Sequence, residues 1–415
     1  MRVLVLSTVF PNPVQPSFGV FVRERMRRVA RDAEVVVVAP VAWFPLDRFV
    51  RGRERAAIPR EEVQGPLRVL HPRVLSIPRF GKWLDGVFYA LSLLPVLRSL
   101  RRTFPFDVID AHFAFPDGLA AVLLGRMFGC PVTITLRGSI VRLSRYRLHR
   151  PQLRWALDHA AAVLSVSGFL RDVAAGLGIA PARIRVVPNG VDTERFRPRD
   201  RAAARQALDL PADRPITLSV GTLGAHKGHY RVIGQLPEVI KTHPDLLHVI
   251  IGISLPGYEG RPALERQVRE LGLERHVMIV GERPHDEIPF WLAAADVFCL
   301  ATRSEGWPNV LLEALACGRP VVATRVGGVP EIVTDPAFGI LVPPADDAAL
   351  GAALRDALTR SWDAPAMVAH AAAHSWDRVA ATVVETFRSV IAPAGGGTEA
   401  RADMAGIAPR GGARP

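Results

Sequence analysis

Short apolar runs alternate along most of the chain with stretches of helical periodicity. In the first half, the runs VLVLST, EVVVVAP, DVIDAHF, PVTITL and RIRVVPN have the length and composition of buried strands. Stretches such as FVRERMRRVARD and DGLAAVLLGRMFG lie between them and favour helices. Strands that alternate with helices are typical of βαβ units and parallel sheets. The first half is therefore predicted to be a Rossmann-like α/β domain.

A second series of the same kind follows in the second half. Its apolar runs are ITLSVG, LHVIIG, VMIVG, DVFCLAT, PVVAT and GILVP, and its helical stretches include RPALERQVRELG and VLLEALACG. A charged, proline-flanked stretch at 195–215 separates the two series and suits a linker with a short helix. The chain is therefore predicted to hold two Rossmann-like domains, at 1–195 and 196–374.

The end of the chain has a different pattern. The stretch SWDRVAATVVETFRSVI, at 375–391, has the periodicity of one more helix. Residues 393–415 are rich in Gly, Pro and Ala and have almost no periodicity, which favours a disordered tail.

Two parallel-sheet domains in series leave a cleft between them, and ligands of such sheets bind beyond the carboxyl ends of the strands. The strongest signal at such a position is the segment 304–333, where a helix is predicted to begin near Pro308 and to stop at Gly318. A helix N-terminus suits a diphosphate, and Glu305 and Glu313 lie on either side of it. One carboxylate can then bind a ribose and the other a transferred sugar. The alternative is a pair of surface glutamates on an amphipathic helix.

A lysine in a glycine-containing loop gives the second signal. Lys227 follows the strand that ends at Gly221, and the chain holds only three lysines among its 52 basic residues. The order of a P-loop is absent. A lysine beyond a strand can neutralise a leaving diphosphate, and the alternative is an incidental surface lysine.

Two weaker signals lie in the first domain. Gly19 ends the loop after the first strand, where the backbone can approach a ligand closely. His112 and Asp117 follow one strand, and Arg137 and Gly138 follow the next, so all four are expected at the cleft edge. His112 can act as a base or position an acceptor, although a lone histidine at a strand end is more often a structural hydrogen-bonder.

The charge is uneven along the chain. Residues 1–200 hold 31 Lys and Arg against 16 Asp and Glu, a net charge of +15, and the remainder holds 21 against 24, a net charge of −3, which gives +12 for the chain. Such a half can face an anionic membrane, a phosphorylated acceptor or nucleic acid, or it can be a solvated arginine-rich surface. It contains no nucleic-acid motif, so no nucleic-acid partner is predicted. The apolar stretch 83–104, which ends in Arg98, Arg101 and Arg102, favours either a helix in a bilayer interface or a core helix with a basic end.

Composition indicates that the chain can form globular cores and favours a reducing cellular compartment. Hydrophobic residues make up 49% of the chain, which suffices for ordinary globular cores. The three cysteines, Cys130, Cys299 and Cys317, lie apart in apolar runs and favour a reducing compartment. The N-terminus lacks the features of a signal peptide, and no run reaches the roughly 18 apolar residues of a membrane span. We therefore expect a cytoplasmic protein, with contact at the inner face of the cell membrane as an option.

Together these segments resemble the family 4 glycosyltransferases of the GT-B fold over roughly residues 1–392. The stretches 296–333 and 165–198 are the most characteristic, and the opening loop looks closest to bacterial polysaccharide-building members of the teichuronic-acid type. The resemblance implies two Rossmann-like domains that face an inter-domain cleft, with the helix at 375–392 packed back on the first. It also implies retaining transfer of a hexosyl group from a UDP- or GDP-sugar to a polysaccharide, lipid-linked or small-molecule acceptor. No cofactor beyond the donor and no metal are expected, since a D-x-D motif is absent.

The resemblance also assigns roles by position. Glu313 would hold the ribose, Glu305 would contact the donor sugar, and Lys227 would pair with the diphosphate; with His112 as the acceptor-side candidate, the catalytic set is Glu305, Lys227 and His112. The first domain would bind the acceptor through Gly19, His112, Asp117, Arg137 and Gly138. The donor set is Gly221, Thr222, Lys227, Gly281, Arg283, Glu305, Gly306, Trp307, Pro308, Asn309 and Glu313.

Two positions depart from the family pattern. Thr222 stands where the family usually has an arginine that binds the diphosphate, and Arg137 stands where it often has histidine. Arg325 and Arg137 are candidates for the missing cation. The departures keep alternatives open: a non-catalytic nucleotide-sugar-binding homologue, and a nucleotide-sugar epimerase of the same architecture.

Overall fold

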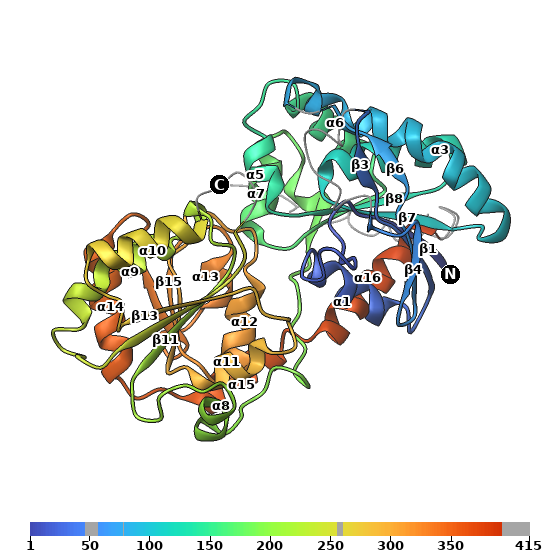
Figure 1. The fold of residues 1–415 in the computed structure, drawn as a ribbon. Coiled ribbons are helices and arrows are strands. Elements are labelled where there is room, and N and C mark those ends of the chain that lie inside the picture. Colours follow the sequence, from blue (N-terminus) through green and yellow to red (C-terminus); the bar gives the residue numbers. More distant parts are fainter. Residues whose placement is uncertain (46–56, 78, 255–259, 392–415) are drawn as a thin grey trace, which may run out of the picture.

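The computed structural model describes residues 1–45, 57–77, 79–254 and 260–391. These residues form two α/β lobes, each built around a parallel sheet (Figure 1). The predicted tail at 393–415 lies outside the described residues.

The N-terminal lobe contains an eight-stranded sheet in the order β10-β9-β8-β7-β1-β2-β5-β4. All neighbours are parallel except β4 and β5. The central strands β7 and β8 are buried at every position, as expected when helices cover both faces of a parallel sheet. The strands are β1 (Arg2–Leu6), β2 (Glu34–Val38), β4 (Glu61–Gln64), β5 (Leu67–Leu70), β7 (Val108–His112), β8 (Val132–Leu136), β9 (Ala162–Ser165) and β10 (Ile184–Val186), with a separate pair, β3 (Val41–Trp43) and β6 (Arg73–Leu75).

Helices of this lobe cover the two faces of the sheet. On one face, α1 shares a core with the C-terminal helix α16, and on the other face α3, α4, α6 and α7 form a second core. The helices are α1 (Val20–Val29), α3 (Asp85–Thr103), α4 (Leu119–Phe128), α5 (Ser139–Leu143), α6 (Arg150–His159) and α7 (Gly168–Ala175), with the shorter helical segments η2 (Arg79–Leu84), η3 (Ala114–Gly118) and η4 (Pro181–Arg183).

The C-terminal lobe contains a six-stranded, wholly parallel sheet in the order β13-β12-β11-β14-β15-β16. Helices α9, α10 and α14 cover one face, while α8, α11, α12 and α15 cover the other. The strands are β11 (Ile216–Val220), β12 (Leu247–Ile251), β13 (Val277–Gly281), β14 (Val297–Leu300), β15 (Val321–Thr324) and β16 (Gly339–Val342). The helices are α8 (Arg201–Ala207), η5 (Ala225–Lys227), α9 (His229–Val239), α10 (Gly260–Glu270), α11 (Ile288–Ala294), α12 (Asn309–Ala316), α13 (Val329–Ile332), α14 (Asp347–Thr359), α15 (Ala364–Ala372) and α16 (Trp376–Ile391).

The last helix crosses from the second lobe to the first. Figure 1 shows α16 beside α1, far from α15 in the same region of the sequence. Val383 and Phe387 are fully buried in a core that they share with Val5 and Met26. The N-terminal lobe is therefore completed by residues from the end of the described chain.

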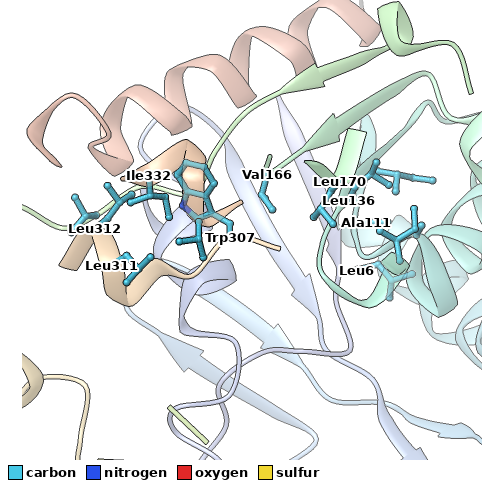
Figure 2. Close-up of a cluster of buried hydrophobic side chains, with 14 of the residues drawn as sticks. Leu6, Ala111, Leu136, Val166, Leu170, Trp307, Leu311, Leu312 and Ile332 are labelled. Carbon is cyan, nitrogen blue, oxygen red and sulfur yellow. The ribbon is translucent and has the colours of Figure 1, made fainter. Parts of the chain in front are cut away.

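An apolar seam joins the lobes beside the strand ends. Figure 2 shows Trp307 and Ile332 of the second lobe together with Val166 and Leu170 of the first. The backbones also meet, because a Cβ built on Gly306 would lie 3.0 Å from the Cα of Gly138. Glycine at position 306 therefore permits close contact between the lobes, whereas a Cβ at position 138 would lie at an ordinary contact distance of 3.7 Å from the nitrogen of Gly306.

The helix that contains α3 is the apolar stretch at 83–104 that the sequence indicated. Residues Gly81–Thr103 are long and apolar enough to span a bilayer by length and composition alone, because an 18-residue window within them has a mean hydropathy of 1.2. Polar residues and Pro95 divide the helix into shorter apolar runs, but the mean hydropathy of the window remains high. Only 39% of that window is buried in the protein, so much of the helix faces outward.

Candidate active site

A cavity of about 280 Å³ lies between the two lobes. The C-terminal lobe lines it with residues that follow β11 and β13 and with the first turns of α12, and the N-terminal lobe lines it with α1 and the loop before it. This is the location expected for a ligand of two facing parallel sheets. The lining includes Ser17, Val20, Phe21, Glu24, Gly190, Gly221, Thr222, Glu282, Arg283, His285, Asn309, Glu313 and Trp376.

Helix α12 points its first residues into this cavity. Pro308 precedes the helix in an extended conformation, Asn309 is the first helical residue, and Gly318 follows the end of the helix with a φ of 70°. Pro308 is thus the residue before the helix, where proline still limits the backbone at its start. Asn309 and Glu313, one turn apart, both line the cavity.

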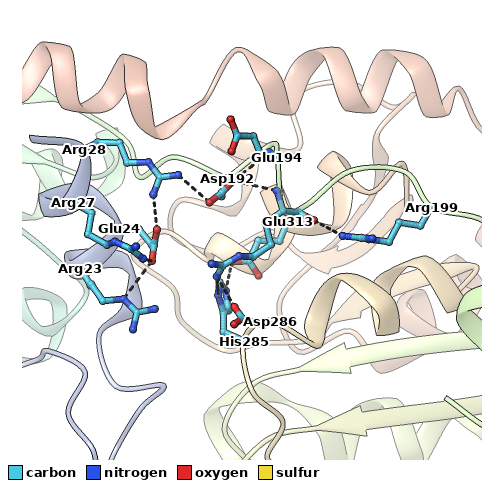
Figure 3. Close-up of polar contacts among 11 residues, drawn as sticks. Arg23, Glu24, Arg27, Arg28, Asp192, Glu194, Arg199, His285, Asp286 and Glu313 are labelled. Carbon is cyan, nitrogen blue, oxygen red and sulfur yellow. Dashed lines mark hydrogen bonds and ion pairs between the residues drawn. The ribbon is translucent and has the colours of Figure 1, made fainter. Parts of the chain in front are cut away.

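Glu313 is held by a chain of polar contacts that begins in the N-terminal lobe (Figure 3). Arg28 of α1 donates to Asp192 over 2.9 Å, and the other carboxylate oxygen of Asp192 accepts from the backbone N–H of Arg195. The Arg195 side chain reaches Nδ1 of His285 at 3.1 Å, and Nε2 of His285 lies 3.1 Å from Glu313.

The contacts of His285 determine which of its ring nitrogens carries the proton. Arginine only donates, so Nδ1 accepts and the proton sits on Nε2, which donates to Glu313. Burial disfavours protonation of His285, but the charge and hydrogen bond of Glu313 outweigh it and raise the pKa of the histidine. The carboxylate of Glu313 is therefore oriented before any ligand arrives.

Lys227 and Glu305 lie together beside the same cavity. The ammonium of Lys227 donates to Glu305 over 2.5 Å, and the hydroxyl of Thr302 donates to the same carboxylate oxygen. Gly228 has a φ of 76°, and a Cβ there would lie 1.9 Å from the carbonyl oxygen of Ala301. Glycine is thus required for the loop to bring Lys227 against the end of β14. The Lys227 side chain also passes within 3.4 Å of the Cβ position of Gly221, which lines the cavity.

The predicted acceptor-side residues are less accessible than expected. His112 and Asp117 are fully buried, and Arg137 is 4% exposed. Asp117 accepts hydrogen bonds from the backbone N–H and the hydroxyl of Thr8, and burial raises its pKa well above the usual value. These side chains form part of the lobe beneath the cleft.

His112 is neutral in this setting. Its Nε2 lies 3.1 Å from Asp110, and Arg137 lies 2.9 Å from its Nδ1. Burial lowers the pKa of His112 to about 4, against the opposing charge of Asp110. The expectation that the imidazole reaches the cleft edge is wrong for this conformation, because the side chain of the last residue of β7 points into the packed lobe.

Arg137 connects this buried group to the donor side. Its guanidinium donates to the side-chain oxygen of Asn189 over 3.1 Å, and the amide of Asn189 donates to Asn309 over 3.0 Å. The guanidinium also lies 4.5 Å from the ring centroid of Phe21, which lines the cavity. Arg137 therefore links the first lobe to the start of α12.

The remaining predicted residues fall around this centre. Gly281 ends β13 with a φ of 91°, and Arg283, two residues later, lines the cavity.

The other predicted residues lie nearby. Gly19, with a φ of 82°, precedes α1, and a Cβ there would lie 2.5 Å from the carbonyl oxygen of Val9. The indole of Trp307 is buried in the seam, so only its backbone remains for a ligand. Arg325 is exposed after β15 and does not line this cavity.

Several lining residues were not predicted. Phe21 and Glu24 follow Gly19 on α1, and their helical spacing alone looks like a core face and a surface charge. His285 lies in a loop that no local motif marks. Asn189, which bonds Asn309 next to the cavity, lies within the characteristic stretch 165–198 but was not singled out there. No group of three or more His, Cys, Asp or Glu side chains placed to hold a metal ion occurs in the described part of the chain.

Comparison with known proteins assigns both lobes. A model of the group 1 glycosyl transferases matches residues 200–374, and a model of glycosyltransferase family 4 matches residues 19–195. TuaC of Bacillus subtilis, a glycosyltransferase assigned to teichuronic acid biosynthesis, is 28% identical, over 85% of this chain and 88% of TuaC.

Two further relatives match at higher identity. A D-inositol 3-phosphate glycosyltransferase of Acidothermus cellulolyticus is 35% identical, over 84% of this chain and 82% of its own length. A GDP-mannose-dependent alpha-(1-6)-phosphatidylinositol monomannoside mannosyltransferase of Mycolicibacterium smegmatis is 34% identical, over 88% of this chain and 91% of its own.

Solved structures share the fold. Sucrose-phosphate synthase from Thermosynechococcus elongatus superposes with a TM-score of 0.77 at 22% identity, over 94% of this chain and 100% of that chain. HepE of Anabaena, solved in complex with UDP-glucose, superposes with a TM-score of 0.70 at 20% identity, over the same shares of the two chains. The chain therefore belongs to the family 4 glycosyltransferases and has their GT-B fold of two Rossmann-like domains, as the sequence motifs predicted.

Proposed function

We propose that this glycosyltransferase is a retaining, metal-independent hexosyltransferase that uses a UDP- or GDP-sugar. The observation that carries the proposal is one cavity in which Glu313 and Asn309 of α12 meet the strand-end residues Gly221 and Thr222, with Lys227 and Glu305 beside it. A relative named for GDP-mannose and a structural neighbour solved with UDP-glucose support a nucleotide-sugar donor.

The roles follow from charge. In this proposal the diphosphate lies at the start of α12, where free N–H groups and the positive end of the helix dipole stabilise the developing negative charge. Lys227 supplies a cation that Glu305 already holds in place. Arg283 lines the cavity and can serve as the second cation for the diphosphate, because position 222 holds a threonine and supplies no charge. Glu313 accepts hydrogen bonds from the ribose hydroxyls.

The proposed transfer needs no protein base at the acceptor. The bond between the sugar anomeric carbon and the diphosphate oxygen breaks, the acceptor oxygen bonds to that carbon on the same face, and a phosphate oxygen takes the acceptor proton. The sequence left His112 as a base, an acceptor-positioning group or a structural hydrogen-bonder. We assign it a positioning role through Arg137, because its imidazole is fully buried. Lobe closure excludes water and favours transfer over hydrolysis.

The acceptor is a glycan, a lipid-linked molecule or a small molecule, since the names of the relatives include inositol phosphate, a phosphatidylinositol mannoside and teichuronic acid. We keep a cytoplasmic location, with contact at the inner face of the membrane, as part of the proposal. No nucleic-acid partner and no cofactor beyond the donor are proposed.

A thermal-shift screen with UDP- and GDP-sugars tests the donor site. A ligand at a hundred times its Kd stabilises a folded protein by about 2.7 kcal/mol. We expect a clear shift with one donor class, and its loss or strong reduction in Lys227→Ala and in Glu313→Ala. Lys241→Ala is the matched control, because that exposed lysine pairs with Glu238 elsewhere on the same lobe. Unchanged shifts in both site variants would show that the donor binds elsewhere.

Product analysis then tests the reaction. Incubation with donor and acceptor in excess EDTA should still give product, and the anomeric configuration of the donor should be kept. Isomerised donor in the absence of acceptor would favour the epimerase alternative, and binding without turnover would favour the non-catalytic one.

A further inference from the structure

A second cavity, of about 870 Å³, lies wholly within the N-terminal lobe. It is bounded by η2 and the start of α3, by η3 after β7, and by α5 with the connection to α6. Its lining includes Trp83, Phe115, Ser139, Arg142, Tyr146 and His149. None of the roles assigned above uses these side chains.

The cavity carries an excess of positive charge. Arg142, Arg145 and Arg147 line it, are exposed, and form no ion pair with an acidic side chain among the described residues. Lys82 also lines it, but its ammonium already bonds Asp85 at 3.0 Å and Ser76 at 2.6 Å. The buried Nδ1 of His149 has no hydrogen-bond partner within the described residues. Three unpaired guanidinium groups at one cavity suit a phosphate, which arginine binds in bidentate fashion.

An apolar surface adjoins these cations. Val87 and Leu91 lie one turn apart on the same side of α3, and Trp83 precedes them in η2; the three side chains are 38%, 62% and 37% exposed. Tyr146 and Leu148 beside the arginines are also more than half exposed. We call Trp83 of η2 together with Val87 and Leu91 of α3 the α3 stripe. Contiguous exposed apolar side chains of this kind mark a surface that binds an apolar partner.

The position of the cavity connects it to the transfer site. Ser139 and Phe115 follow β8 and β7, at the carboxyl ends of the strands. Gly138, next to Ser139, lies against Gly306, which follows Glu305 in the donor lobe. A head group that extends from the cavity toward β8 would therefore approach the place where the donor sugar is proposed to lie.

We propose that this cavity binds the phosphate ester of an amphiphilic acceptor, whose hydrocarbon chain lies along the α3 stripe. The arginines recognise the phosphate, and the stripe and the exposed Tyr146 and Leu148 remove the chain from water. The acceptor role of this ligand rests on the proposed function, whereas its binding does not.

Binding is tested with three soluble probes on the full chain without donor: octyl phosphate, glycerol 3-phosphate and octyl glucoside, each below its micelle concentration and measured by calorimetry. We expect octyl phosphate to bind at least tenfold more tightly than either of the others, because only it carries both phosphate and chain. Comparable affinity for glycerol 3-phosphate would indicate a free-phosphate site, and comparable affinity for octyl glucoside a purely apolar one; either result overturns the proposal.

Two variants assign the two parts of the site. The double variant R142Q/R145Q should lose at least tenfold in affinity for octyl phosphate, and Leu91→Ser should weaken octyl phosphate while leaving glycerol 3-phosphate unchanged. Arg269→Gln and Leu271→Ser on the C-terminal lobe are the matched controls, since Leu271 is also exposed. Unchanged binding in R142Q/R145Q, with circular dichroism that shows an intact fold, would place the ligand elsewhere and sink the proposal.

Vesicles distinguish the source of the phosphate. Phosphatidylcholine vesicles with and without phosphatidylglycerol report contact with bulk anionic lipid. We expect R142Q/R145Q to reduce both octyl phosphate binding and transfer to a phosphate-bearing amphiphile, while the donor-induced thermal shift stays intact. Loss of vesicle binding alone, with octyl phosphate binding and transfer unchanged, would show a general membrane contact and overturn the acceptor site. An absent donor shift in the unmodified protein would instead count against the proposed function and leave the probe-binding result standing.

Discussion

Arg137 illustrates how a charged side chain can occupy a buried place. Burying a guanidinium is costly unless its donors are bonded. Here the group bonds His112 and Asn189, lies over Phe21, and sits near the buried carboxylate of Asp110. Burial, with the nearby charge of Arg25, lowers the pKa of Arg137. The long side chain of Arg137 reaches Asn189 in the loop that contacts α12.

Arg137→Met should separate this positioning role from donor binding. Methionine keeps the length of the side chain but leaves Nδ1 of His112 and the side-chain oxygen of Asn189 without a donor, at about 1–3 kcal/mol for each unsatisfied buried group. We expect a lower melting temperature and a reduced kcat, while donor affinity changes little because Arg137 does not line the donor cavity. Arg171→Met, on the exposed side of α7, is the control. A loss of donor affinity as large as the loss of kcat would mean that Arg137 acts on the donor itself.

The candidate site also shows which residues a sequence can indicate. Lys227, Glu305 and Glu313 could be predicted because glycine loops and helix starts after strands have a fixed place at the sheet edge. The burial of the His112 side chain could not be predicted in this way. Strand β7 is buried on both faces, so the alternation of apolar and polar residues along it does not show which face holds the cleft. Phe21 and His285 line the cavity from separate segments, and Asn189 lies next to it through its hydrogen bond to Asn309. Only the three-dimensional contact between lobes brings these residues together.

At the scale of single elements, α13 supplies a contact that local sequence does not reveal. Glu331 accepts from the backbone N–H groups of Gly168 and Phe169, at 2.8 and 3.0 Å, and thereby caps α7 from the opposite lobe. Ser167 caps the same helix from within its own lobe by accepting from Leu170. A carboxylate at a helix N-terminus stabilises the free donors and the helix dipole. The start of α7 therefore holds the two lobes together on one side of the cleft.

Glu331→Ala should loosen the lobes, whereas Ser167→Ala should only weaken the helix. Each substitution removes a cap worth about 1 kcal/mol. For Glu331→Ala we expect a larger radius of gyration in solution scattering without donor and a higher KM for the donor. Ser167→Ala should show the same small loss of stability with neither of these changes. Identical scattering for Glu331→Ala and the unmodified protein would show that this contact does not control closure.

Elements differ in how far the sequence could predict them. The helix at 375–391 and the strands of both sheets were predictable because long periodic or apolar runs have few alternatives. α5 and α13 have only five and four residues. Helices this short do not form alone, since nucleation is costly and tertiary contacts must stabilise them. Gly138 and Glu331, which place these two helices at the seam, therefore acquire their roles only from the packed structure.

At the scale of the whole molecule, the chain crosses between lobes twice. The first crossing is the segment near residue 195, and the second brings α16 from the C-terminal lobe onto α1. The stability of the N-terminal lobe therefore depends on residues of α16 (Trp376–Ile391), at the opposite end of the described chain from its first strand. Two crossings connect the lobes, so any relative movement of the lobes must be accommodated at both connections.

Phe387→Ala should unfold the N-terminal lobe first, although the residue lies at the far end of the described chain. Its ring is fully buried in the core shared with Val5 and Met26, and such a truncation costs about 3–5 kcal/mol. Calorimetry should show one transition moving to a lower temperature, and hydrogen exchange should accelerate in β1 and β2 but not in β11 and β14. Leu354→Ala on α14, fully buried in the opposite lobe, should give the reverse pattern. Equal acceleration in both sheets for either variant would mean that the apolar seam around Trp307 makes the two lobes unfold as one unit, and the lobes would then have to open without breaking that seam.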